Sequence, residues 1–73
     1  MNYSFGFIGG GRITKIILEG LKRKSSLPKS IIVSDTNNDV LEKLKQLFPN
    51  ITICNDNREP AKQDFVFIAL HPP

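Results

Sequence analysis

The glycine turn at residues 9–11 has the residue types and the position that binding of a diphosphate requires. It follows an apolar run, residues 5–8, and precedes a segment with helical periodicity, so it lies between a buried strand and a helix. Glycine allows a tight turn and leaves no Cβ in the path of an anion, while unpaired N–H groups lie at the positive end of the helix dipole. The alternative interpretation is a flexible turn that binds nothing. The candidate ligands of the diphosphate are Gly9, Gly10, Gly11, Arg12 and Ile13.

A carboxylate is expected at the end of the second strand of such a fold, and Asp35 is in that place. It lies 26 positions after Gly9, and the polar insert at residues 23–30 accounts for the distance beyond the usual ~20 positions. A carboxylate here accepts hydrogen bonds from the adenosine ribose hydroxyls and repels a 2′-phosphate, which favours NAD. Ser34, Thr36 and Asn37 can still hydrogen-bond a phosphate, so the predicted cofactor is NADP or NAD. The alternative for Asp35 is a turn or helix-capping residue.

The elements that position these residues follow from hydrophobic periodicity. Strands are predicted at residues 5–8, 31–33, 51–54 and 65–70, with helices at 12–24 and 37–48 and a short one within 57–63. Strands that alternate with helices through right-handed crossovers form a parallel sheet. The predicted fold is therefore α/β, a partial Rossmann fold with about four parallel strands in the order 3-2-1-4, flanked by helices.

Two details of the helices are predicted. In the first helix an apolar spacing places one set of residues on the buried face: Ile13, Ile16, Ile17 and Leu21. Thr14 stands where a third Gly or Ala normally permits close packing of helix on strand, and we expect Gly6 to relieve that crowding. In the second helix Asn37 is the expected N-cap and Pro49 the end.

Four segments together resemble the nucleotide-binding half of pyrroline-5-carboxylate reductase, in the order and spacing of that family. They are GFIGGGRI at residues 6–13, IIVSDTN at 31–37, NDNRE at 55–59 and FVFIALHPP at 65–73. The resemblance implies reduction of pyrroline-5-carboxylate to proline with NAD(P)H. It also implies that residues 1–73 are a partial NAD(P)-binding domain and that the family's C-terminal substrate and dimerisation domain has no counterpart here. We therefore expect no turnover by this chain alone.

The resemblance also assigns further cofactor contacts. It implies Ser34, Thr36 and Asn37 around the adenosine phosphate or ribose and Asn57 near the adenine. Beside the nicotinamide ribose it implies Ala69, Leu70, His71 and Pro72. The sequence departs from the family at several of these positions: Thr36 stands where an Arg often serves NADPH, and His71 where a Lys is usual. No residue of the chain is predicted to be catalytic or to bind a metal.

Composition limits the other function classes. The chain has 73 residues and a formal net charge of +3, which suits one small domain and an anionic ligand. The basic cluster at residues 22–24 has no interleaved aromatic residue, so we expect no nucleic-acid binding. No apolar run approaches membrane-spanning length, and Cys54 is the single cysteine, so a cytoplasmic location is expected. The alternative function is a free-standing, non-catalytic nucleotide-binding or self-associating module, with homo-oligomers that form through the edge of the fourth strand.

Overall fold

Four parallel strands form a single sheet in the order β3-β2-β1-β4, which confirms the predicted α/β fold and strand order. The structure is a computed structural model and describes residues 2–70. Its elements, in chain order, are β1 (Ser4–Ile8), α1 (Arg12–Arg23), β2 (Ser30–Ser34), α2 (Asn38–Leu47), β3 (Thr52–Cys54), α3 (Arg58–Ala61) and β4 (Phe65–Ile68).

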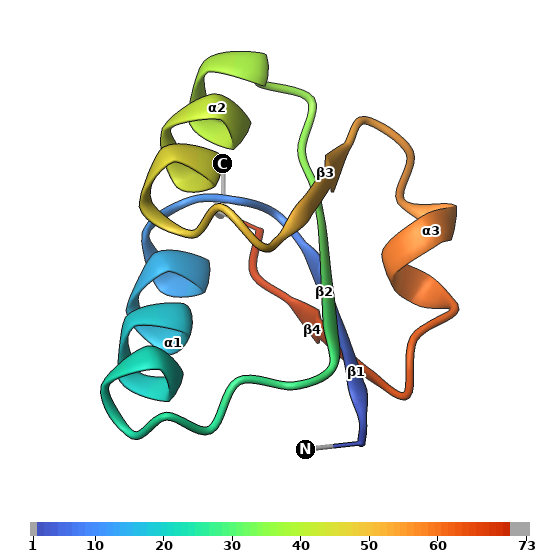
Figure 1. Cartoon of the computed structure of the whole chain (residues 1–73). Coiled ribbons are helices and arrows are strands. Elements are labelled where there is room, and N and C mark those ends of the chain that lie inside the picture. The colour runs from blue at the N-terminus through green and yellow to red at the C-terminus, as the bar shows by residue number, and fades with distance from the viewer. Residues whose placement is uncertain (1, 71–73) are drawn as a thin grey trace.

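The helices form two layers around the sheet. The helices α1 and α2 cover one face, and the short α3 covers the other (Figure 1). The core is built mainly from the sheet, α1 and α2 and consists of Phe7, Leu18, Ile31, Val33, Leu41, Leu44, Phe48 and Ile51. Because all strands run parallel, their carboxyl ends meet at one edge, where ligands bind in open α/β sheets.

The α3 layer depends on the glycine within β1. A Cβ added to Gly6 would lie 2.0 Å from the carbonyl oxygen of Pro60 in α3. Gly6 therefore allows the backbone of α3 to approach the sheet. The prediction that Gly6 relieves crowding by Thr14 is wrong, since the position that a Cβ would take on Gly6 faces Pro60 in α3 rather than α1.

The buried face of α1 also differs from the prediction. Thr14 and Leu18 are fully buried, whereas Ile13 and Ile16 are 53% and 58% exposed. At 100° per residue, Ile13 lies about a quarter turn from Thr14. In this rotation the buried Thr14 side chain reaches the glycine turn, as described below.

The predicted N-cap and end of α2 are confirmed. The Asn37 side chain accepts hydrogen bonds from the N–H groups of Asp39 and Val40, at 3.0 and 3.3 Å. The helix ends at Leu47, two residues before Pro49. Within residues 2–70, no helix is long and apolar enough to cross a membrane.

The first and last strands are joined at their amino ends. The Ser4 N–H and hydroxyl both donate to Oδ2 of Asp64, at 2.9 and 3.1 Å, and the Asp64 N–H donates back to the Ser4 hydroxyl. These bonds lower the pKa of Asp64 below its ordinary value of 3.8, because the backbone N–H of Ser4 and then its hydroxyl stabilise the carboxylate. Further along the strands, the rings of Phe7 and Phe67 stack at 4.9 Å.

Candidate functional site

The glycine turn lies at the carboxyl edge of the sheet, between β1 and α1 (Figure 1). Gly9 has a φ of +110°, a conformation that residues with a Cβ rarely adopt. A Cβ here would also lie 2.5 Å from the carbonyl oxygen of Ala69. The N–H of Gly9 donates to the carbonyl of Ser34 at 2.7 Å, which joins the turn to the end of β2. The tight turn predicted at Gly9 is therefore confirmed.

Thr14 holds the other side of the turn. Its hydroxyl donates to the carbonyl oxygen of Gly9 at 2.5 Å, and the side chain is completely buried. Sequence reasoning treated Thr14 only as a bulky replacement for a small residue. Thr hydroxyls often donate to nearby backbone carbonyls, and this tendency could have indicated the contact.

Several backbone amides of the turn remain available to a ligand. Among the described residues, the N–H groups of Gly11, Arg12 and Ile13 have no hydrogen-bond partner, and the first bond of the helix runs from Lys15 N–H to the Gly11 carbonyl. These orphan donors lie at the positive end of α1, where a diphosphate is stabilised. Gly10 differs from these residues, because its N–H already donates a hydrogen bond to a side chain.

The partner of Gly10 is Asp35. Oδ2 of Asp35 accepts from the Gly10 N–H at 2.8 Å, and Oδ1 accepts from the Asn37 N–H at 2.9 Å. The structure thus brings the predicted ribose-binding carboxylate into direct contact with the predicted diphosphate turn. Asp35 is partly exposed, so a ribose can still approach its oxygens.

The other predicted contacts lie at the ends of β2 and β3. Ser34 is fully buried, and its hydroxyl donates to Oδ1 of the exposed Asn57 at 2.6 Å. Thr36 and Asn37 are exposed beside them. Asn55, which sequence reasoning did not select, donates from its side chain to the Asp35 carbonyl at 2.9 Å and to the Asn38 side chain at 2.8 Å. Its position within the NDNRE segment was the available signal.

The end of β4 lies next to the glycine turn. The Ala69 N–H donates to the carbonyl of Ile8 at 2.9 Å, and Leu70 is 61% exposed. His71 and Pro72, which were also predicted to contact the cofactor, lie outside the described residues.

A groove opens directly from the glycine turn and runs between α1 and α2, with a volume of about 400 Å³. Its lining residues are Gly10, Gly11, Arg12, Lys15, Val40, Lys43, Leu44, Gln46 and Leu47.

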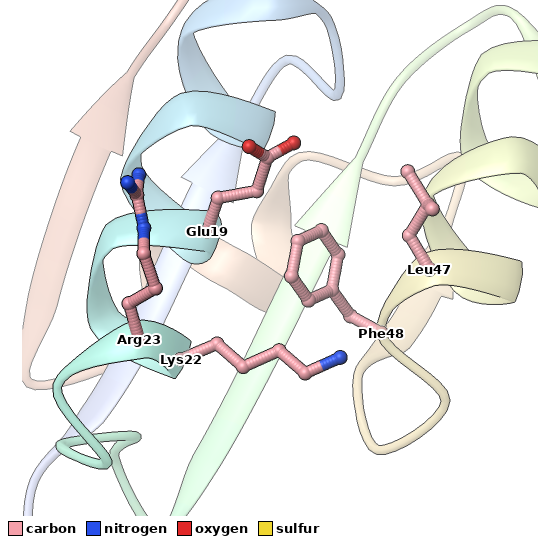
Figure 2. A pocket seen from close by; sticks show the side chains of 5 residues that line it. All are labelled: Glu19, Lys22, Arg23, Leu47 and Phe48. Carbon is pink, nitrogen blue, oxygen red and sulfur yellow. The ribbon is translucent and has the colours of Figure 1, made fainter.

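A larger cavity of about 530 Å³ lies further along the same two helices, at their carboxyl ends. There Lys22 extends from α1 toward the ring of Phe48, with Nζ 5.6 Å from the ring centroid (Figure 2). This second cavity is not lined by the glycine turn, so its size does not make it the site.

The fold and the turn define a class of protein, the dinucleotide-binding half of a Rossmann domain. A family model described as NADP oxidoreductase, coenzyme F420-dependent, matches residues 4–73, and the chain belongs to that family. It is an NAD(P)-dependent oxidoreductase domain. Neither the curated proteins nor the solved structures include a significant match.

Proposed function

We propose that residues 1–73 bind the dinucleotide of a reductase related to pyrroline-5-carboxylate reductase. The observation that carries this proposal is the set of orphan amides of Gly11, Arg12 and Ile13, which lie beside the positive-φ turn at Gly9. The residues present fit a nicotinamide dinucleotide, because donors for a diphosphate and a carboxylate for a ribose meet at one sheet edge.

In this proposal the chain positions the cofactor and performs no bond-breaking step. The amides of Gly11, Arg12 and Ile13 hold the diphosphate, and Asp35 accepts hydrogen bonds from the ribose hydroxyls. Ala69 and Leu70 follow β4, and in this proposal they contact the nicotinamide half of the cofactor. The bound dinucleotide supplies the hydride.

The reaction itself needs more than these residues. In the pyrroline-5-carboxylate reductase assignment, a second domain supplies the substrate pocket and presents the imine carbon to the hydride. Residues 1–73 are then expected to bind NAD(P)H without oxidising it when pyrroline-5-carboxylate is added. Turnover by residues 1–73 alone would contradict the assignment of the substrate pocket to a second domain.

Calorimetric titration with NADH and NADPH tests the binding site. The wild type should bind at least one of them, and Gly11→Val should lose binding because its side chain would enter the diphosphate path. Gly20→Ala is the matched control: it adds a methyl group to α1 where a Cβ meets no atom within 4 Å. Equal binding by Gly11→Val and the wild type would refute the site.

A second candidate role, self-association, is favoured by the edge of the sheet. Within residues 2–70, β4 pairs with β1 and has no strand on its other side. The strand carries no charge, and exposed apolar side chains gather on and around it: Tyr3, Phe65, Val66, Ile68 and Leu70. Edge strands of monomers are usually protected by charge, proline or a bulge, and β4 has none of these.

We propose that a second copy of the chain pairs with this edge. Five half-exposed side chains offer roughly 500 Å² per copy, or about 1,000 Å² in total, which is the lower limit of a specific interface. Val66→Lys should convert a dimer into a monomer, as measured by sedimentation equilibrium. A wild type that is monomeric at every concentration would contradict the proposal.

A further inference from the structure

The groove beside the glycine turn collects positive charge from both helices. Arg12 and Lys15 line it from α1, and Lys43 lines it from α2. None of the described residues that line it is acidic. Lys15 also pairs with Glu19 at 3.9 Å, but both side chains are about half exposed, so this pair neutralises Lys15 only in part.

The groove floor is apolar. Val40, Leu44 and Leu47 line the groove together with the cationic side chains. Arg12, Lys15 and Lys43 are all exposed, so an anion in the groove can reach them. The chemistry of the groove therefore suits a compact group of high negative charge, such as a phosphate monoester.

Gly10 connects this groove to the ribose position. Its N–H bonds to Asp35, and the same residue lines the groove. The two N–H donors that Asp35 accepts, from Gly10 and Asn37, offset part of its negative charge. A phosphate on a ribose held at Asp35 thus meets a carboxylate that is already paired and a groove that is positive.

We propose that this groove binds the 2′-phosphate of NADP(H) and that Lys43 is the residue that selects the phosphorylated cofactor. The inference rests on the proposed dinucleotide site. From the sequence, the Asp35 carboxylate and the lack of an Arg beside it favoured NAD, while the predicted cofactor stayed NADP or NAD. In the structure a cation from the middle of α2, Lys43, lines the groove that opens from the turn.

The test compares Lys43→Ala with Lys24→Ala by calorimetric titration with NADPH and with NADH. Lys24 is the matched control: it removes the same charge from an exposed residue at the far end of α1. Lys43→Ala should weaken NADPH about tenfold and change NADH less than about twofold, since only NADPH carries the extra phosphate. Lys24→Ala should change neither.

The outcomes separate this inference from the proposed function. Failure of the wild type to bind either dinucleotide would refute the dinucleotide site itself. A wild type that binds NADH as well as NADPH, or a Lys43→Ala variant with an unchanged ratio of the two affinities, would overturn the role of Lys43 and leave the dinucleotide site standing. Circular dichroism of each variant checks that the fold is retained.

Discussion

The carboxylate of Asp35 accepts a hydrogen bond from the N–H of Gly10 across 25 positions of sequence, at 2.8 Å. This bond fixes the end of β2 against the glycine turn. It also uses the one amide of the turn that points toward the ribose-binding carboxylate. The amides of Gly11, Arg12 and Ile13 are left for an anion.

Replacement of Asp35 by Asn should shift cofactor choice. The N–H groups of Gly10 and Asn37 bond to different oxygens of Asp35, so the single amide oxygen of Asp35→Asn can keep only one of these two bonds, and circular dichroism checks that the fold is retained. The charge that repels a 2′-phosphate is lost, and the ratio of NADPH to NADH affinity should rise about tenfold. Calorimetric titration measures this ratio. An unchanged ratio would place cofactor selection away from Asp35.

Two glycine substitutions should have opposite effects on stability. Gly9→Ala places a Cβ at a φ of +110° and 2.5 Å from a carbonyl oxygen, and should lower the free energy of unfolding by at least about 1–3 kcal/mol. Gly20→Ala lies within α1 in open space and should raise it by roughly 0.5–1 kcal/mol. Urea unfolding measures both. A neutral Gly9→Ala would show that the turn does not need its positive φ.

The hydroxyl of Thr14 should matter more than its shape. Thr14→Val keeps the volume but leaves the Gly9 carbonyl without this partner, which should cost about 1–3 kcal/mol of stability. Thr14→Ser keeps the hydroxyl and is the control for the lost bond. If Val and Ser variants unfold at the same urea concentration as the wild type, the bond contributes nothing to the turn.

Stability should fall in acid because of Asp64. Its folded pKa lies below the unfolded value of 3.8, so the folded state binds fewer protons in that range. The contribution is therefore present above pH 3.8 and is lost as pH falls through the folded pKa. Asp56 acts in the same direction, since its side-chain bond with Arg58 lowers its pKa to about 2.

Urea unfolding of wild type and Asp64→Asn at neutral pH and at about pH 2.5 isolates this contribution. The variant should be less stable than the wild type at neutral pH, and the difference should shrink as the pH falls and Asp64 takes up a proton. An equal difference at both pH values would mean that the charge of Asp64 is not involved.

The strand order and the helix positions could be predicted because they depend on local periodicity and on the handedness of crossovers. The rotation of α1 could not. The apolar spacing favoured Ile13 and Ile16 as core residues, but both are exposed, and the buried face instead carries Leu18 and Thr14, whose hydroxyl bonds to Gly9.

Only those parts of the candidate site that local sequence patterns mark could be predicted. The glycine turn and Asp35 have recognisable positions in the chain. The bond from Ser34 to Asn57 and the groove that Lys43 shares with the turn join residues far apart in sequence, and no local pattern contains them. They follow from how two helices and two strand ends pack.

The interior position of β1 has a consequence for biosynthesis. This strand is synthesised before the other described strands, yet β4, one of its two neighbours, is the last of them. The Ser4 amide meets Asp64 only after sixty further residues have been added. During translation β1 therefore presents an open edge to the nascent-chain environment, and the sheet closes only when synthesis has passed residue 68.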